Sequence, residues 1–275
     1  MKVYISVDIE GVAGITHWDE ATKRKPGYTE YREQMTAEAV AACEGAQIAG
    51  ATEIVVKDAH GSGRNILPER LPEGTRLIRG WSGDPQCMVE FIDDSYDAVA
   101  MVGYHAAAGA GGNPLAHTIT GTVAKMLING QITSEYMLHR DCAALHGVPT
   151  VFLSGDRTLC DSATAMNPAT HTVATKESAG GSTTSVHPNV ATAMIRDGMA
   201  AALNDVAAQK ILPLADSFGL ELWYTDHEWA FNASHYPGAR LHDPHAIKYE
   251  TGQFFEIMRI LSFVLEPPVF PEETS

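Results

Sequence analysis

Residues 98–104 read AVAMVGY, a nearly continuous apolar run that leads into His105. Runs of this kind are typical of strands buried on both faces, as in parallel sheets covered by helices. Residues 3–7 and 53–57 have a similar β-rich character, and so do residues 148–153. We therefore expect several buried strands, separated by segments long enough to hold helices.

The segments between these strands have helical signals. Residues 29–48 are rich in alanine and end before Gly50, as a helix closed by glycine does. A second helix is expected from residue 133 or 134 to His146. Alternation of strand and helix predicts an α/β fold, with a mainly parallel sheet flanked by helices.

The pattern continues more loosely beyond residue 165. A long helix beginning at His187-Pro188 and a strand at residues 218–225 are followed by a helix at residues 253–264. They predict a smaller mixed α/β lobe at the C-terminus. We expect residues 1–275 to form a single unit, with two lobes at most: an α/β core at 1–178 and a C-terminal lobe at 182–275.

Two further features constrain this organisation. Residues 118–128 alternate like a strand and lead into the turn signal Asn129-Gly130. Residues 76–78 suit a short strand. Neither feature changes the predicted fold class.

Composition excludes several classes of protein. The 275 residues include 34 acidic and 19 basic side chains, giving a formal net charge of −15. Such acidity argues against a nucleic-acid partner. No apolar run approaches the roughly 18–20 residues of a membrane span, and the start lacks the apolar region of a secretory signal. Four widely spaced cysteines suit reduced thiols. We expect a cytoplasmic protein with no membrane partner.

Metal-ligand residue types follow three of the predicted strands. Asp8 and Glu10 follow the first, Asp58 and His60 the second, and His105 the strand at residues 98–104. The carboxyl ends of parallel strands share one edge of the sheet, where sites form. In extended chain, positions i and i+2 point the same way, about 6–7 Å apart. These residues predict a metal site, although each alone would suit a turn or a solvated loop.

Several short motifs resemble those of one enzyme family. In chain order they are SVDIEG at 6–11, KDAH at 57–60, GYHA at 103–106, HTI at 117–119, ING at 128–130 and SGD at 154–156. Their order and spacing resemble the D-aminopeptidase family, bacterial dinuclear-zinc peptidases that cleave peptides containing D-alanine. The resemblance covers residues 1 to about 156 and thins toward the C-terminus.

The resemblance implies specific roles for six residues. It implies a catalytic histidine at His117 and a bridging position for Asp8 between two ions. The metal ligands it implies are Asp8, Glu10, His60, His105 and Glu135. This chain has Ser134 where the family commonly has a glycine before the last ligand, so Glu135 could instead be a first-turn acid that stabilises a helix dipole.

Charge counting favours two ions over one in this ligand set. Three carboxylates exceed the charge of one divalent ion, whereas two ions leave a net +1 that a bridging hydroxide neutralises. Ligation by imidazole and carboxylate fits zinc without excluding manganese or cobalt. Two such ions lower the pKa of bound water from 15.7 toward about 7 and polarise the scissile carbonyl.

The roles of two further residues stay open. His117 would pass a proton to the departing amine or stabilise the tetrahedral intermediate, and direct nucleophilic attack is less favoured. Asp58 either orients His60 or its loop from behind the ligands, or caps a turn. The other histidines, such as His139 and His146, lack ligand spacing matched by a second element and are read as structural.

The leading functional prediction is a metal-dependent aminopeptidase that removes an N-terminal residue from short peptides. By resemblance alone, that residue is a D-amino acid such as D-alanine. The first alternative is a dinuclear hydrolase of other amides, L-peptides or esters, and the second is a non-enzymatic metal- or ligand-binding protein. Serine-hydrolase and nucleotide-binding motifs are absent from the sequence. The resemblance also implies a ring-like homo-oligomer such as a decamer.

Overall fold

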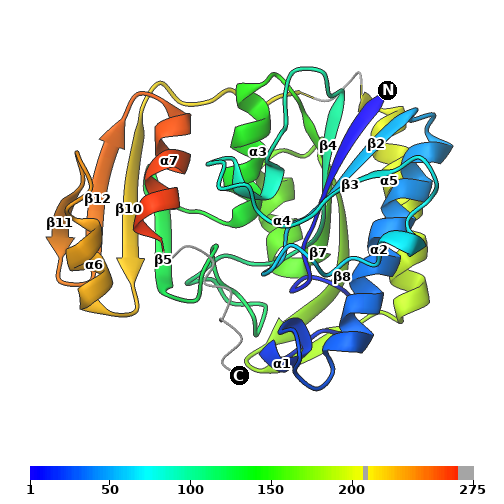
Figure 1. Cartoon of the computed structure of the whole chain (residues 1–275), viewed down its shortest axis with the longest axis horizontal. Helices are drawn as coiled ribbons and strands as arrows, with labels where there is room; N and C mark the ends of the chain where they lie inside the picture. Colours follow the sequence, from blue (N-terminus) through cyan, green and yellow to red (C-terminus); the bar gives the residue numbers. More distant parts are fainter. Residues whose placement is uncertain (207–209, 266–275) are drawn as a thin grey trace.

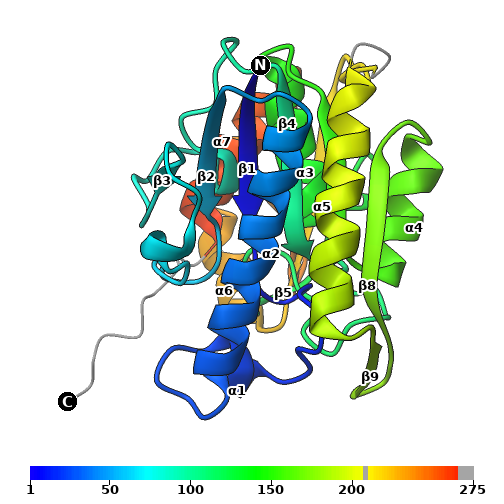
Figure 2. The same cartoon turned by 90° about the vertical axis from the view of Figure 1, so that its right-hand side faces the viewer.

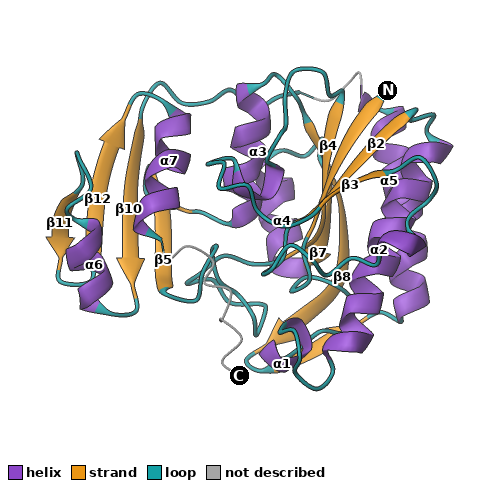
Figure 3. Ribbon diagram, in the orientation of Figure 1, coloured by secondary structure: helices purple, strands orange, loops and turns teal. Residues whose placement is uncertain are grey.

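The computed structural model describes residues 1–206 and 210–265, which form two sheets lying next to each other (Figure 1, Figure 3). The first sheet has seven strands. In spatial order they are β3 (Arg76–Ile78), β2 (Glu53–Asp58), β1 (Lys2–Val7), β4 (Ala98–Tyr104), β7 (Thr150–Asp156), β8 (His171–Ala179) and β9 (Ser182–Ser185). All neighbours are parallel except β8 and β9. The predicted α/β class with a mainly parallel sheet is confirmed.

Helices cover both faces of the first sheet. On one face lie α2 (Tyr28–Ile48) and α5 (Pro188–Asn204), which pack against each other (Figure 2). The opposite face is covered by α3 (Glu135–Leu145) and α4 (Arg157–Met166). Alternate residues of β1 separate the two layers, since Ile5 packs with the α2 side and Tyr4 with the α3 side. Burial on both faces explains why these strands read as continuous apolar runs.

The second sheet is antiparallel throughout. Its order is β11 (Arg240–Asp243), β12 (Ala246–Thr251), β10 (Phe218–Tyr224), β5 (Val123–Ile128) and β6 (Gln131–Ile132). Helices α6 (His227–Ala233) and α7 (Phe254–Val264) pack on it, and α7 also contacts α3 of the first layer. One apolar core therefore continues from the first sheet through α3 and α7 into the second sheet.

Two local expectations differ from the structure. The strand expected at 118–128 begins at Val123, because Ile119 has a positive φ of 66° and its N–H donates to a carboxylate outside any sheet. The resulting β5 joins the second sheet, although it lies in the chain between two strands of the first sheet, β4 and β7. Residues 179–181, where a lobe boundary was expected, form the turn of the β8–β9 hairpin, and α5 after it stays on the first sheet.

The carboxyl ends of β1 and β4 approach each other closely. Beyond the paired strands, the N–H of Asp8 donates to the Val102 carbonyl at 2.8 Å, and that of Gly11 to the Gly103 carbonyl at 2.8 Å. A Cβ on Gly103, whose φ is +71°, would lie 2.3 Å from the Asp8 carbonyl oxygen. Glycine is therefore required there, and the close approach brings the loop after β1 against the end of β4.

A short helix, α1 (Trp18–Ala21), and two 3₁₀ turns, η1 (Pro68–Arg70) and η2 (Cys87–Val89), complete the elements named here. Among the described residues, no helix combines the length and apolar character needed to cross a membrane.

Candidate metal centre

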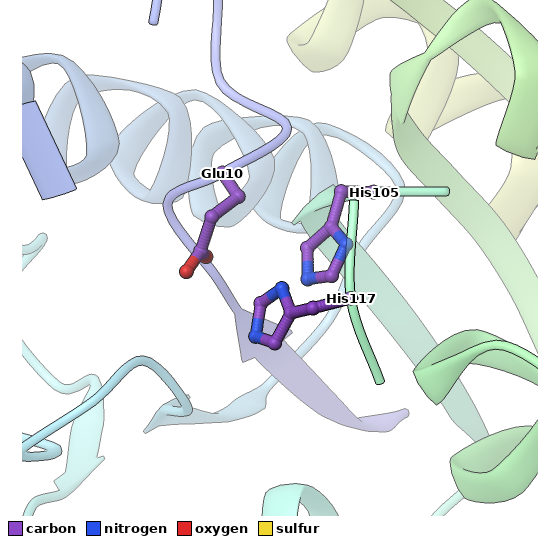
Figure 4. A group of neighbouring side chains, drawn as sticks. All are labelled: Glu10, His105 and His117. Carbon is purple, nitrogen blue, oxygen red and sulfur yellow. The ribbon is translucent and has the colours of Figure 1, made fainter. Parts of the chain in front are cut away.

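Six ionisable side chains converge beyond the carboxyl edge of the first sheet. Four of them follow parallel strands: Asp8 and Glu10 after β1, His60 after β2 and His105 after β4. Glu135 is the first residue of α3, where Ser134 caps the helix through its side chain. His117 lies on the loop before β5, and Figure 4 shows its ring close to the ring of His105 and the carboxylate of Glu10. All six residues predicted from the sequence are thus brought together.

Asp8, Glu10 and His60 form one half of this cluster. His60 Nδ1 lies 3.1 Å from Glu10 Oε2 and 3.4 Å from Asp8 Oδ1. The other ring nitrogen of His60, Nε2, is 2.8 Å from the Ala21 carbonyl oxygen and donates to it. Nδ1 is therefore the ring nitrogen that faces the two carboxylates.

Asp8, His105 and Glu135 form the other half. His105 Nε2 lies 3.2 Å from Glu135 Oε2 and 3.4 Å from Asp8 Oδ2. His105 Nδ1 donates to the Ala106 carbonyl at 2.9 Å. Asp8 thus faces His60 with one carboxylate oxygen and His105 with the other, the placement that a bridging carboxylate requires.

The donor set fits divalent metal ions. Glu10 Oε2 and His105 Nε2 are buried and have no hydrogen-bond partner among the described residues, despite the short distances to their neighbours. Zinc ligands lie about 2.0–2.2 Å from the ion, so tetrahedral neighbours are about 3.3 Å apart. The distances of 3.1–3.4 Å between His60 or His105 and the carboxylates match that spacing. Donation of the second ring N–H to a backbone carbonyl is also usual for metal-binding histidines.

His117 lies against the second half of the cluster. Its ring stacks on that of His105, with centroids 4.4 Å apart and planes 8° from parallel. Its Nε2 is 3.6 Å from Glu135 Oε1, and its Nδ1 is 3.0 Å from the Leu115 carbonyl oxygen. The rings of Trp18 and His117 meet edge to face, with their centroids 5.2 Å apart. This side chain is 14% exposed, more than His105 at 0%, so it lies on the solvent side of the cluster.

Charge within the cluster shifts several pKa values. Burial alone would raise the pKa of Glu135, but the imidazoles of His105 and His117 lower it to about 2. Burial alone would lower the pKa of His105, but Glu135 and Asp8 raise it well above its ordinary value, and Glu10 and Asp8 do the same for His60. The metal-free cluster therefore offsets its carboxylates with protons, which bound cations would replace.

A buried polar network holds the backbone of Glu10. Lys176 on β8 donates from Nζ to the Glu10 carbonyl at 2.6 Å and to the Ile15 carbonyl at 2.9 Å. Asn113 Nδ2 donates to the same Glu10 oxygen at 3.0 Å and to Asp156 Oδ2 at 3.0 Å. Sequence reasoning missed Lys176 as a supporting residue, because it is 166 positions from Glu10 and no local spacing marks it.

Asp58 organises the loop that follows His60. Its Oδ2 accepts from the N–H groups of Asn65 at 2.5 Å and Ile66 at 2.7 Å, and its Oδ1 accepts from Asn65 Nδ2 at 2.8 Å. The same amide donates to the His60 carbonyl at 2.7 Å. Asp58 therefore reaches His60 through Asn65 and the backbone.

His139 lies behind the cluster, outside the ligand set. Its Nδ1 donates to the Glu135 carbonyl, 2.7 Å away, and its Nε2 accepts from Met88 N–H at 3.3 Å. Burial lowers its pKa to about 4, so the ring is neutral. Its contacts are structural, in line with the sequence-based interpretation.

The sequence model of the D-aminopeptidase family matches residues 1–263 of this chain. The chain belongs to the D-aminopeptidase family. A D-aminopeptidase from Bacillus subtilis (strain 168) is 30% identical over 244 residues, which are 88% of each chain. The solved structure of a Zn-dependent D-aminopeptidase from the same species, a self-compartmentalizing protease, has a TM-score of 0.91 at 26% identity and covers 98% of both chains.

Proposed function

We propose that this protein is a zinc-dependent aminopeptidase that removes an N-terminal D-amino acid, such as D-alanine, from short peptides. The observation that supports this most directly is the shared carboxylate of Asp8, which faces one imidazole with each oxygen. Membership of the D-aminopeptidase family and the likeness to a Zn-dependent D-aminopeptidase support the reaction and the metal.

Five side chains would hold two ions in this proposal. Glu10 and His60 would bind one ion, His105 and Glu135 the other, and Asp8 would bridge them. When bound, the ions supply an acidified water and a positive field for the scissile carbonyl. Lys176 and Asn113 keep the Glu10 backbone in place, and Ile119 N–H fixes Glu135 Oε1 at 2.6 Å.

His117 is proposed to handle the proton of the departing amine. It is the most solvent-facing of the three histidines, and its Nδ1 is already engaged by the Leu115 carbonyl. Its Nε2 therefore presents the exchangeable position toward the cluster. From there it can donate a proton to the leaving nitrogen or stabilise negative charge on the attacked carbonyl. Asp58 is proposed to support His60 indirectly, through Asn65.

The deciding experiment measures metal content and hydrolysis together. Purified protein should contain about two zinc ions per chain, and a chelator should abolish hydrolysis of D-Ala-Gly-Gly until zinc is restored. The matched L-Ala-Gly-Gly should be hydrolysed far more slowly. Preference for the L-peptide, or for an ester, would favour the alternative of a different dinuclear hydrolase. Stoichiometric zinc without hydrolysis of any amide would favour a binding protein.

We also propose that the protein forms a cytoplasmic homo-oligomer, a ring-shaped decamer that encloses its active sites. The structural relative is a self-compartmentalizing protease. Apolar side chains are exposed on the second-sheet lobe, including Phe231 at 58% and Phe263 at 72%. The four cysteines are free, as expected in a reducing compartment. Light scattering would give the mass of the assembly, and a monomer at working concentration would contradict this part of the proposal.

A further inference from the structure

A pocket of about 160 Å³ lies between the loop after β3 and helix α7. We call it the Trp81 pocket. Its apolar lining consists of Trp81, Cys87, Ile119, Met258, Leu261 and Leu265. Trp81 and Cys87 follow β3, Ile119 lies on the loop between β4 and β5, and the last three residues come from α7 and the residue after it.

Two walls of the Trp81 pocket are bonded to the metal-site loops. The indole N–H of Trp81 donates to the Gly61 carbonyl at 2.7 Å, and Gly61 directly follows His60. The N–H of Ile119 donates to Glu135 Oε1 at 2.6 Å, and Ile119 lies two residues after His117. The positive φ of Ile119, 66°, turns its backbone toward Glu135. Two residues of the pocket lining are therefore hydrogen-bonded to Glu135 itself and to the residue that follows His60.

The polar groups of the lining are largely occupied by the protein itself. Glu90 Oε1 pairs with Lys57 Nζ at 2.7 Å, and Glu90 Oε2 accepts from Ser82 N–H at 2.9 Å and from its hydroxyl at 2.5 Å. The hydroxyl of Ser262 donates to the Met258 carbonyl at 3.0 Å. The carboxylate of Asp84 accepts from Gln86 N–H at 2.8 Å within its own loop. The interior therefore presents mainly carbon and sulfur atoms.

The Trp81 wall is held rigidly. Lys57 Nζ lies 4.0 Å from the centre of the Trp81 ring, and the Lys57–Glu90 pair is buried, with side chains 0% and 2% exposed. Together with the bond to Gly61, this cation contact fixes the plane of the indole. A preformed apolar pocket binds an apolar group without first having to order its own walls.

We propose that the Trp81 pocket receives the side chain of the substrate's amino-terminal residue and favours apolar side chains larger than a methyl group. The proposal rests on the aminopeptidase function proposed above and deepens it. An aminopeptidase substrate ends at its amine, so the first side chain suits a bounded pocket, whereas later residues need an open path. A cavity of about 150 Å³ can hold a benzene molecule, so 160 Å³ accommodates a leucine or phenylalanine side chain.

The test compares tripeptides D-Ala-Gly-Gly, D-Leu-Gly-Gly and D-Phe-Gly-Gly with the zinc-loaded enzyme. We expect kcat/KM to be higher for D-Leu and D-Phe than for D-Ala. The variant Ser262→Trp places a large side chain at the α7 wall. It should lower the ratio of kcat/KM for D-Phe over D-Ala at least about tenfold, because even one methylene in an apolar pocket is worth roughly 10- to 200-fold. Leu261→Ala, which widens the same wall, should raise the ratio.

A matched control separates the pocket from general effects on α7. Phe263→Trp adds a similar bulk to the next residue of the helix, where the side chain is 72% exposed and does not line the pocket. It should leave the ratio unchanged. Equal ratios for Ser262→Trp and wild type, in folded and zinc-loaded protein, would overturn the proposal. So would a size preference that follows the second residue, in the series D-Ala-Xaa-Gly, instead of the first.

Binding of products gives a readout that does not depend on turnover. Calorimetric titration of zinc-loaded protein with free D-phenylalanine should show tighter binding than with D-alanine, and Ser262→Trp should remove the difference. If no peptide is hydrolysed by zinc-loaded wild type, the proposed function fails. If peptides are hydrolysed but D-phenylalanine binds no better than D-alanine, the pocket proposal alone fails.

Discussion

Each sheet has a lysine–carboxylate pair, and the two pairs differ in environment. Lys57 on β2 and Glu90 lie 2.7 Å apart with side chains 0% and 2% exposed, whereas Lys248 on β12 and Glu221 on β10 lie 3.2 Å apart with side chains 32% and 28% exposed. Buried charges persist only where partners and hydrogen bonds hold them. The interior of the first sheet therefore holds a charged pair, whereas the pair on the second sheet lies nearer the surface.

The same contrast distinguishes the first sheet, whose carboxyl edge carries the candidate metal ligands, from the second sheet. The parallel strands are buried on both faces, so polar residues are delivered to the carboxyl edge, where Asp8, Glu10, His60 and His105 lie. Strand β10 instead alternates buried and partly exposed residues, as antiparallel strands with one wet face do. The second sheet, through α7, supplies one apolar wall of the Trp81 pocket.

The largest effect is expected from removing the shared carboxylate. Asp8→Ala takes one oxygen from each half of the cluster, so we expect both ions to be lost. Several kcal/mol of transition-state stabilisation would go with them, a fall in kcat/KM of at least about 10⁴-fold. Elemental analysis and peptide hydrolysis measure the two outcomes. Glu250→Gln on the second sheet is the control, and normal zinc content in Asp8→Ala would refute the bridging role.

Removing His117 should affect turnover and spare the metal. General acid–base groups contribute typically 10²- to 10⁴-fold, so His117→Ala should lose activity in that range. Zinc content should stay at the wild-type value, because five other side chains hold the ions. Loss of zinc on substitution would instead make His117 a ligand, which its place beside Glu10 and His105 allows.

The two lysine pairs can be compared directly by substitution. Lys57→Met leaves Glu90 buried without its cation, and breaking a buried pair costs about 3–5 kcal/mol of unfolding free energy. Lys248→Met breaks the more exposed pair, for which about 0–1 kcal/mol is expected. Urea unfolding of both variants measures the difference. Equal losses of unfolding free energy in the two variants would show that the buried pair matters no more to stability than the exposed one.

Sequence patterns locate five of the seven strands of the first sheet, because each of these five is recognisable by itself, whereas β8 and β9 were not predicted. A residue that directly follows a parallel strand can then be placed at the shared edge, as for His60 and His105. Local patterns cannot tell which sheet a strand joins, so the place of β5 beside β10 was not predicted. Lys176 and Asn113 were missed for a similar reason, since they meet Glu10 only through the tertiary fold.

Glu38 on α2 provides the smallest effect and a test of buried charge without a full partner. Burial raises its pKa to about 7, its Oε1 accepts from Ala13 N–H at 2.9 Å, and its Oε2 has no hydrogen-bond partner among the described residues. The folded state therefore holds a proton that the unfolded chain, with the ordinary value of 4.5, releases earlier. This contribution to stability is complete below pH 4.5 and is lost as the pH rises through 7.

Glu38→Gln resembles the protonated side chain at every pH, so it should unfold like wild type at pH 5. At pH 8 the ionised wild-type carboxylate destabilises the fold, and the variant should be more stable than wild type by up to on the order of 3 kcal/mol. Burial lowers the pKa of Lys176 to about 8. While Lys176 is charged it stabilises the ionised Glu38 carboxylate, so it reduces the stability difference between variant and wild type. Urea unfolding at the two pH values, in chelated protein, measures it. A variant advantage that is equal at pH 5 and pH 8 would mean that Glu38 does not titrate in this window, and that the first sheet tolerates this carboxylate in its ionised form.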